Sequence, residues 1–532
     1  MSGSLWNSLD WSRILQDLGA FFTQPAPGGL MFCSMGFWAL FTAFFFLYIF
    51  VRKWNRTAML LYVLAFDLFF FYKANGLLML LLPATAAVTF FLTELMRRPG
   101  GVPSRAAGNY FSDRFAEKPI SAPPSTTPSH TSLGTGRKWL LALIVLLDLA
   151  PLVYFKYSGF FVEGMLNPLL GSNFSVGDIV LPIGISFYTF QAISYSVDVY
   201  RGKYTGRPAF LEFLFYLSFF PLLLAGPITR AGRFLPQIRA NRPATRHELR
   251  FGLWLIILGL LKKGVLADYL AVYNNLAFDT PASYSGFELL MAVFGYTMQI
   301  YLDFSGYSDL SIGIASLMGF RLDENFLFPY RALNLTEFWR RWHISLSSWF
   351  RDYVYIPLGG NRKGQVRTLL NNFLTMVVAG LWHGSTWMFV IWGALHGAGL
   401  VVHKLCRPWL KKIPDKWPVQ VLSWMLTMLF VMVCWVFFRA DSLQSCQEIL
   451  GRILTDFDLA YLPPFWAARK LWCVMLLVAS AGLLIPPKVY GRLMARFIKL
   501  PWPLLFIAFL IAAQLVVQFR SGDIQPFIYY QF

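Results

Sequence analysis

Long apolar runs separated by short polar segments extend over almost all of this 532-residue chain. A helix that crosses a bilayer needs about 20 consecutive apolar residues. The pattern therefore predicts an all-α, polytopic integral membrane protein with roughly 10 to 12 transmembrane helices, the shorter runs forming re-entrant or interfacial helices. The apolar runs are 31–50, 58–72, 77–96, 139–155, 181–199, 210–225, 251–261, 287–302, 369–378, 387–402, 421–438, 471–485 and 504–519.

The composition and the distribution of charge also indicate that the main partner of the chain is the lipid bilayer. Hydrophobic residues make up 57% of the chain and charged residues 14%, which departs strongly from soluble globular proteins. The net charge of +19 does not indicate nucleic-acid binding, because the cations lie in short clusters between apolar runs, as in loops retained in the cytoplasm. Clusters after the first and third runs place both loops inside, so the N-terminus is expected on the extracytoplasmic side.

One apolar run does not fit a simple alternation of sides. Arginines cluster both at 201–207 and at 230–250, and only the run 210–225 lies between them. Both clusters favour the cytoplasm, so this run is expected to enter the membrane and return on the same side. Pro221 would break its helix.

Four regions follow from these patterns. Residues 1–30 are expected to form an interfacial N-terminal helix, and residues 31–96 the N-terminal transmembrane helices. Residues 97–138, rich in Pro, Ser, Thr and Gly, bury too little apolar surface to offset ordering, which predicts a mobile cytoplasmic loop. Residues 139–532 form the remaining membrane core.

Two histidines, His343 and His383, lie inside apolar stretches. Ionisable groups at membrane depth are costly and persist mainly where they face a polar cavity and function there. The competing interpretation is an ordinary interhelical hydrogen bond. Gly384, directly after His383, would let a substrate approach the backbone closely.

The segments around these histidines form a recognisable set. It comprises LPIGISFYTFQAISYSVDVYRGKY from residue 181, QIYLDFSGYSDLSIG from 299, FWRRWHISLSSWFRDYVYIPLGGNRKG from 338, NNFLTMVVAGLWHGSTWMFVIWGALHG from 371, WVFFRADSL at 435–443 and the terminal PFIYYQF. This set resembles the membrane-bound O-acyltransferase (MBOAT) family in its bacterial AlgI/DltB-like branch. The resemblance implies that 139–532 is the catalytic core, with helices around a central tunnel, in a bacterial inner membrane.

Acyl transfer from a thioester to a hydroxyl needs a base, a polarised carbonyl and the exclusion of water. Histidine suits proton transfer near neutral pH. His383 matches the family's active-site histidine and is the candidate base. His343 matches the family's second histidine or asparagine position, where it would position the donor or hydrogen-bond to the carbonyl. No serine or cysteine is placed as an acylated nucleophile, which favours direct transfer.

The resemblance implies movement of an acyl group, most simply acetyl, toward hydroxyls of an extracytoplasmic or secreted polysaccharide. The donor would be acetyl-CoA or an acyl-carrier-protein thioester, with no permanently bound cofactor, and a periplasmic SGNH-like acetyltransferase would complete the transfer. D-alanyl transfer from a carrier protein to a cell-wall polymer is the alternative within the family. A non-catalytic transporter or scaffold is the alternative of another class.

Other polar and aromatic residues are candidates for substrate binding. The arginines and aspartate around His343 fit either a cytoplasmic funnel that attracts phosphates or an interfacial helix with snorkelling side chains. The aspartates in YLDFSGYSD fit either orientation of a histidine or substrate hydroxyl, or helix-end capping. The histidines lack the ligand spacing of a metal site. The candidates are Trp382, Trp342, Arg340, Arg341, Arg351, Asp352, Asp303 and Asp309.

Overall fold

The computed structural model describes residues 16, 19–20, 23–25, 30–97, 135–177, 179–223, 226–410 and 412–519. Within these ranges the secondary structure consists of helices and no strand occurs, which confirms the all-α class. The predicted interfacial helix at 1–30, the loop at 97–138 and the terminal PFIYYQF lie largely or wholly outside the described residues.

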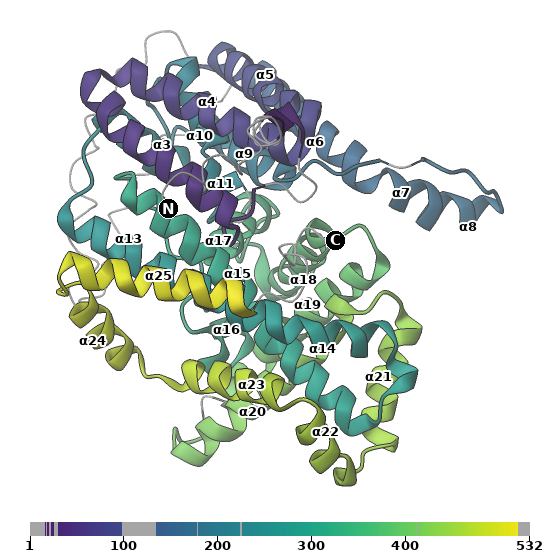
Figure 1. Cartoon of the computed structure of the whole chain (residues 1–532). Coiled ribbons are helices and arrows are strands. Elements are labelled where there is room, and N and C mark those ends of the chain that lie inside the picture. The colour runs from purple at the N-terminus through teal and green to yellow at the C-terminus, as the bar shows by residue number, and fades with distance from the viewer. Residues whose placement is uncertain are drawn as a thin grey trace, which may run out of the picture.

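The first long helices form one side of the molecule (Figure 1). They are α3 (Met35–Trp54), α4 (Arg56–Asn75), α5 (Leu81–Met96) and α6 (Thr135–Leu152). A tight turn joins α3 to α4, because Asn55 ends the first helix and its side chain accepts a hydrogen bond from the Ala58 N–H at the start of the second. Beyond Pro151, α6 continues as the π-helical segment η2 (Val153–Tyr157), then α7 (Ser158–Phe161), η3 (Val162–Leu166) and α8 (Asn167–Leu170), which project from the body.

A 32-residue helix, α15 (Gly286–Leu317), runs through the centre of the molecule and is buried over most of its length. Its neighbour α13 (Arg246–Gly259) approaches it closely, because both helices carry glycine at the crossing. A Cβ atom on Gly313 would lie only 2.7 Å from the Gly252 carbonyl oxygen. The chain then continues from α13 through the π-helical η4 (Leu260–Ala267) into α14 (Asp268–Asp279).

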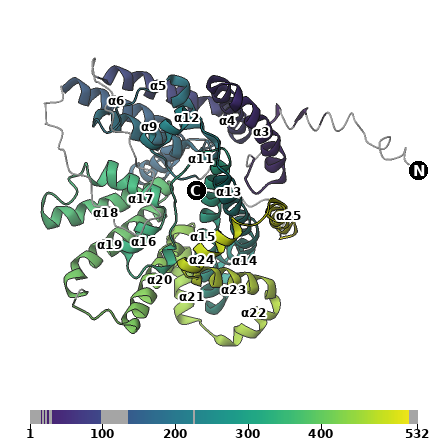
Figure 2. The same cartoon turned by 90° about the vertical axis from the view of Figure 1, so that its left-hand side faces the viewer.

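The remaining helices complete the body around α15 (Figure 2). Two of them, α18 and α19, pack tightly against each other, with Gly380 facing Gly393. The elements are α9 (Ile185–Tyr200), α12 (Ala231–Ala240), α16 (Leu335–Arg341), α17 (Ile344–Phe350), η7 (Arg351–Tyr355), α18 (Gly364–His383), α19 (Trp387–Leu410), α20 (Trp417–Arg439), α21 (Leu443–Thr455), α22 (Leu462–Ala468), α23 (Lys470–Leu484), α24 (Pro487–Phe497) and α25 (Trp502–Phe519).

Six helical units in the described part of the chain are long and apolar enough to cross a membrane, and a seventh results if the pair Leu459–Ala468 and Lys470–Leu484, bent by 102°, is one span. This is fewer than the roughly 10 to 12 spans predicted from the apolar runs. The central helix α15 contributes to the difference because it is buried in protein and carries polar residues. The polytopic character is confirmed, whereas the larger number of spans stays a prediction.

The run 210–225 forms two short helices, α10 (Phe210–Ser218) and α11 (Phe220–Leu223). At 1.5 Å per residue, α10 is about 13 Å long, less than half the hydrocarbon thickness of a bilayer. Asp67 on α4 holds the break between them, accepting hydrogen bonds from the Ser218 hydroxyl at 3.1 Å and the Phe220 N–H at 3.0 Å. The segment is therefore too short to span, in agreement with a re-entrant element, and the side from which it enters stays a prediction.

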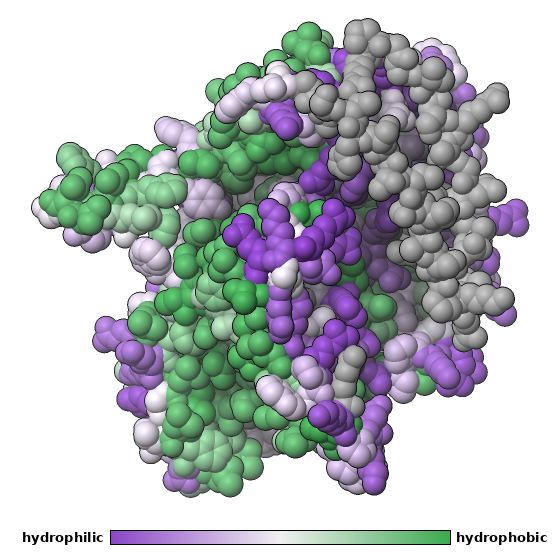
Figure 3. Space-filling model, turned by 180° about the vertical axis from the view of Figure 1, so that it is seen from behind, coloured by the Kyte–Doolittle hydropathy of each residue, from purple (hydrophilic) through white to green (hydrophobic). Residues whose placement is uncertain are grey.

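The outer surface is suited to lipid contact. Figure 3 shows apolar residues gathered over a broad face of the molecule, next to a region of hydrophilic ones. Large apolar side chains are exposed along the candidate spans, among them Leu426 and Leu429 of α20 and Phe506 of α25. A hydrocarbon environment removes the cost of exposing such side chains to water.

Candidate active site

His343 lies at the junction between α16 and α17 and is completely buried. Its backbone has φ 42°, in the left-handed region that residues with a Cβ seldom adopt. Asn334 caps the start of α16 by accepting a hydrogen bond from the Glu337 N–H at 2.9 Å. The two short helices thus hold His343 at a sharp turn between them, and strained backbone of this kind often accompanies a functional role.

Asn325 fixes the orientation of the His343 ring. Its side-chain oxygen lies 3.0 Å from His343 Nδ1 and also accepts hydrogen bonds from the Ser345 N–H and hydroxyl. An amide oxygen only accepts, so Nδ1 must carry the proton, which leaves the other ring nitrogen, Nε2, as an acceptor. Nε2 is buried and has no hydrogen-bond partner among the described residues.

His383 is the last residue of α18 and is also buried. Its ring packs edge-on against Trp392 at 4.9 Å and Phe438 at 5.3 Å between ring centroids. Trp382 stands between the two histidines, with centroid distances of 4.9 Å to His383 and 6.2 Å to His343. The structure therefore brings the two histidines to the same aromatic-lined region of the interior.

The predicted tryptophans occupy different positions. Trp382 borders both histidines, whereas Trp342 packs against Trp435 at 5.0 Å and Phe326 at 5.1 Å, on the side of His343 formed by the central core. Gly384 has an extended backbone, and a Cβ there would lie 2.0 Å from the Phe389 ring. In this structure Gly384 is needed for packing against α19.

The end of α18 is held by side chains from η2. Lys156 Nζ donates hydrogen bonds to the backbone carbonyls of Trp382 at 2.8 Å and His383 at 2.9 Å. The Tyr157 hydroxyl donates to the Leu381 carbonyl at 2.7 Å. Sequence analysis did not single out either residue. The signal available was a lysine directly after an apolar run, at a position where charge is costly.

The predicted donor-binding residues separate into two groups. Arg341 on α16 forms an ion pair of 2.6 Å with Glu337 one turn earlier, and Arg340 beside it is exposed. In η7, Asp352 pairs with Arg351 at 2.9 Å and lies 3.5 Å from Arg230. These contacts connect the Arg351 and Asp352 pair to Arg230. Arg341 instead contacts Glu337 of α16 and the Leu327 carbonyl.

Arg230, at the start of α12, is a residue that motif reasoning placed only in a basic loop. Its guanidinium lies 4.5 Å from the Tyr353 ring centroid, and both terminal nitrogens are buried without a hydrogen bond to the described residues. Arg201 stands over the same ring at 5.7 Å and donates to the Asp352 carbonyl. The Tyr353 hydroxyl donates to Asp198. This basic cluster of Arg201, Arg230 and Arg351 is suited to hold an anion.

A row of stacked aromatic rings extends from the basic cluster to the histidines. Tyr353 contacts Trp349 at 5.2 Å, and Trp349 stacks on Phe190 of α9 at 3.7 Å. Phe190 in turn stacks on Trp382 at 5.4 Å. The residues form a second apolar cluster, separate from the main core, that lies between α9, α17 and α18.

Asp303 and Asp309 on α15 both face lysines of η4. Asp309 accepts a hydrogen bond from Lys262 at 2.7 Å. Asp303 pairs with Lys263, which also lies 2.7 Å from Asp268. Ion pairing, rather than the helix-end capping considered above, thus accounts for both carboxylates, and a direct role toward substrate stays a prediction.

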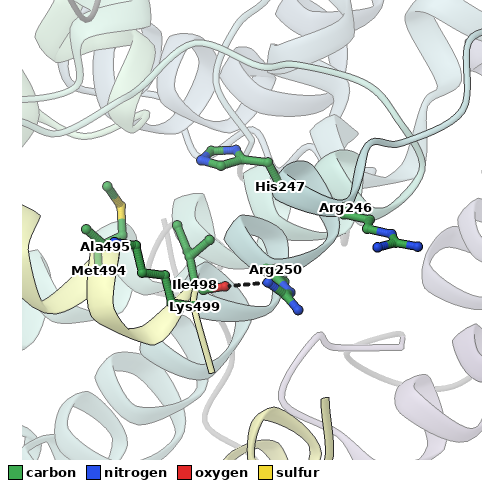
Figure 4. Close-up of a pocket in the computed structure, with 7 residues that line it drawn as sticks. All are labelled: Arg246, His247, Arg250, Met494, Ala495, Ile498 and Lys499. Atoms are coloured by element: carbon green, nitrogen blue, oxygen red, sulfur yellow. Dashed lines mark hydrogen bonds between the residues drawn. The ribbon is translucent and has the colours of Figure 1, made fainter. Parts of the chain in front are cut away.

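A separate groove of about 370 Å³ lies between α13 and α24 (Figure 4). Arg250 crosses it to donate a hydrogen bond to the Ile498 carbonyl at 3.0 Å. It contains none of the predicted site residues, so it is not a candidate for the reaction. Its lining consists of Arg246, His247, Arg250, Met494, Ala495, Ile498 and Lys499.

Comparison with known proteins identifies a family whose model matches the part of the chain that contains this site. Residues 205–447 match the model of the membrane-bound O-acyltransferase family. The matched range contains His343 and His383, together with α18, α19 and most of the basic cluster.

Similar proteins include two O-acetylating relatives and one D-alanylating relative. A probable alginate O-acetylase AlgI of Pseudomonas putida is 43% identical over 60% of this chain, and a peptidoglycan O-acetyltransferase of Helicobacter pylori is 36% identical over 59%. A teichoic acid D-alanyltransferase of Streptococcus thermophilus is 32% identical over 52%. The matches cover 64% to 66% of the length of these relatives. Residues 205–447 therefore form a membrane-bound O-acyltransferase domain.

Proposed function

We propose that the protein is a membrane-embedded O-acyltransferase that passes an acetyl group from a cytoplasmic thioester toward hydroxyls of an extracytoplasmic polysaccharide. The observation that carries this proposal is the convergence of His383 and His343 on Trp382 inside the domain that matches the family. Relatives that O-acetylate alginate or peptidoglycan support acetyl as the group transferred.

In the proposed reaction His383 is the general base. Its imidazole takes the proton of the acceptor hydroxyl as the oxygen attacks the thioester carbonyl carbon. The carbon–sulfur bond then breaks, and the departing thiolate receives the proton from the imidazolium, so the histidine returns to its starting state. Aromatic side chains around the ring exclude water and so suppress hydrolysis of the thioester.

His343 is suited to hold the donor. Because its Nδ1–H is directed at Asn325, its free Nε2 accepts a hydrogen bond and cannot donate one to the thioester carbonyl. Its partner would therefore be an N–H group, such as an amide of a pantetheine arm. This favours donor positioning over the contact to the carbonyl that was considered from the sequence.

The donor's phosphates would bind at the basic cluster. Arg230 offers a buried Nη1 without a hydrogen bond to the described residues, and its Nη2 lies 3.5 Å from Asp352. Arg201 and Arg351 lie beside the same η7 segment. A phosphate is an effective partner for such guanidinium groups. The aromatic row from Tyr353 to Trp382 would then line the path of the thioester arm. Both acetyl-CoA and an acyl-carrier protein carry their thioester at the end of a phosphopantetheine arm, so both supply a phosphate.

The acceptor and the partner belong to the same proposal. We expect transfer to a polysaccharide, completed by a periplasmic SGNH-like acetyltransferase, in a bacterial inner membrane. D-alanyl transfer to a cell-wall polymer is the second candidate, favoured by the similarity to the teichoic acid D-alanyltransferase. Membranes that contain the protein would be supplied with labelled acetyl-CoA in one reaction and with a D-alanyl-carrier protein in another, and the incorporated label would distinguish the two.

The central test is His383→Ala. We expect this change to abolish acyl incorporation, since no base remains to take the hydroxyl proton, while the protein stays monodisperse in detergent. His247→Ala, in the groove of Figure 4, is the matched control and should keep wild-type incorporation. Full activity of His383→Ala at equal protein level would remove the catalytic assignment and favour a transporter or scaffold.

A further inference from the structure

The C-terminal end of α18 is completed by another part of the chain. The last four carbonyls of an α-helix have no partner within the helix. In α18 the Gly384 N–H reaches only the Gly380 carbonyl, at 3.4 Å. The next three carbonyls, of Leu381, Trp382 and His383, are satisfied by Tyr157 and Lys156.

This arrangement is unusual because α18 lacks a local C-terminal cap. Helices commonly end with a residue in the left-handed conformation, whose N–H groups bond back to the last turn. Gly384 is instead extended, with φ −161° and ψ 159°. The position of the final turn, and with it the position of the His383 side chain, therefore depends on contacts from η2.

The η2 segment is shaped to provide these contacts. Pro151 removes one backbone hydrogen bond from α6, and the five residues Val153–Tyr157 that follow are π-helical. Single π-helical turns within α-helices are frequent at functional sites. Here the turn lets two consecutive side chains, Lys156 and Tyr157, reach three consecutive carbonyls of α18.

We propose that Lys156 is a positioning residue for His383 and that Tyr157 contributes to the same positioning by binding the Leu381 carbonyl. The Lys156 ammonium binds the two carbonyls that flank the His383 N–H and so fixes the base against Trp382 and Trp392. A cation at a helix C-terminus is also favoured by the helix dipole.

This inference rests on the proposed function, because it assigns His383 the role of base. Lys156→Met keeps the length of the side chain but removes its charge and its donors. We expect kcat for acyl transfer to fall on the order of 100-fold with little change in KM, since a small displacement of a catalytic group has effects of this size.

Companion variants separate positioning from general structural damage. Tyr157→Phe removes a single hydroxyl and should lower kcat several-fold, and Lys156→Arg, which keeps charge and donors, should restore part of the activity lost in Lys156→Met. Tyr154→Phe and Lys138→Met are the matched controls: both side chains are exposed on the same helical unit, and both variants should behave as wild type.

Hydrogen–deuterium exchange supplies a measurement independent of turnover. Amides of residues 380–386 should exchange faster in Lys156→Met and Tyr157→Phe than in the two controls. Unchanged exchange, or a wild-type kcat in Lys156→Met, would overturn the inference. If Lys156→Met does not fold, the same readouts in Tyr157→Phe decide. A wild-type protein without transfer activity would instead refute the proposed function, and the exchange data would still show whether Lys156 holds α18.

Discussion

At the scale of single residues, the candidate site depends on groups that satisfy one another's hydrogen bonds. Asn325 accepts from His343 and twice from Ser345, and it donates to Ser308. Each of these groups is buried, so losing a partner exposes the others to an uncompensated desolvation cost. The orientation of His343 is therefore set by an amide 18 residues earlier in the chain.

Replacement of Asn325 by Ala should show this dependence. The change leaves the His343 Nδ1–H and the Ser345 N–H without their acceptor, and we expect about 1–3 kcal/mol less stability together with weaker donor binding, seen as a raised KM. Thermal unfolding in detergent and steady-state transfer kinetics measure the two effects. Asn173→Ala, on an exposed loop, is the control, and equal behaviour of the two variants would contradict the role given to Asn325.

Only some residues of the candidate site could be predicted from the sequence. His343 and His383 stood out because ionisable groups are rare in apolar stretches. Asn325, Lys156 and Arg230 did not, because each acts on a residue from another helix or loop, and no local spacing reveals that contact. Asp303 and Asp309 were found, but their lysine partners on η4 became visible only in three dimensions.

At the scale of helices, glycine determines how closely α18 and α19 approach. A Cβ on Gly380 would lie 2.2 Å from the Phe389 carbonyl oxygen and 3.0 Å from the Gly393 Cα. Backbone atoms cannot move aside as the end of a flexible side chain does. Since α18 ends in His383, this close contact also influences the position of the base.

Gly380→Ala should therefore separate the two helices. We expect a loss of about 1–3 kcal/mol, the usual cost of overpacking, and a reduced kcat because His383 moves with α18. Gly482→Ala on α23 meets no atom within 4 Å and is the control, with stability within about 1 kcal/mol of wild type. Detergent stability and kcat that stay at the level of that control would show that α18 and α19 can separate without consequence.

Helix prediction from apolar runs worked best where helices face lipid. The runs 421–438 and 504–519 correspond closely to α20 (Trp417–Arg439) and α25 (Trp502–Phe519). The run 287–302 covers only about half of the 32-residue α15, and the run 369–378 half of the 20-residue α18. The helix α15 lies inside the protein, where neighbouring groups satisfy polar residues, so apolar continuity understates its length. The helix α18 instead begins with the exposed segment 364–367, which an apolar run does not include.

At the scale of the whole molecule, Glu248 connects segments that are far apart in the sequence. It accepts hydrogen bonds from Arg242 and Thr245 near the start of α13 and from Arg321 after α15. Burial alone would raise the pKa of this carboxyl, but the hydrogen bonds outweigh it and hold the pKa well below its usual range. The carboxylate is therefore stabilised by folding.

Low pH should reduce the stability of the folded protein by protonating Glu248. Its stabilising effect is complete above the pKa of an unfolded glutamate, about 4.3, and is lost as the pH falls below that value toward the lowered pKa of the folded state. Glu248→Gln should thus be less stable than wild type at neutral pH, and the difference should shrink below about pH 4. Unfolding midpoints measured across this range test the expectation, and a gap independent of pH would contradict it.

The positive charges of the loops predict the orientation of the protein in the membrane, and cysteine labelling can test this prediction. We expect Ser104→Cys, in the basic loop 97–138, to react with a membrane-impermeant maleimide only after the cells are permeabilised. Asn173→Cys, beyond α8, should react in intact cells. Both changes would be made in a cysteine-free background, because Cys406 is partly exposed. Labelling on the opposite sides would invert the assignment of donor and acceptor faces.

The left-handed backbone at His343 creates a conflict between function and thermal stability. Glycine adopts that conformation without penalty, so a selection for thermostability alone would be drawn toward glycine at position 343. Such a variant would survive heating and lose the imidazole that faces Trp382. Engineering of this protein for thermal stability should therefore keep histidine at position 343.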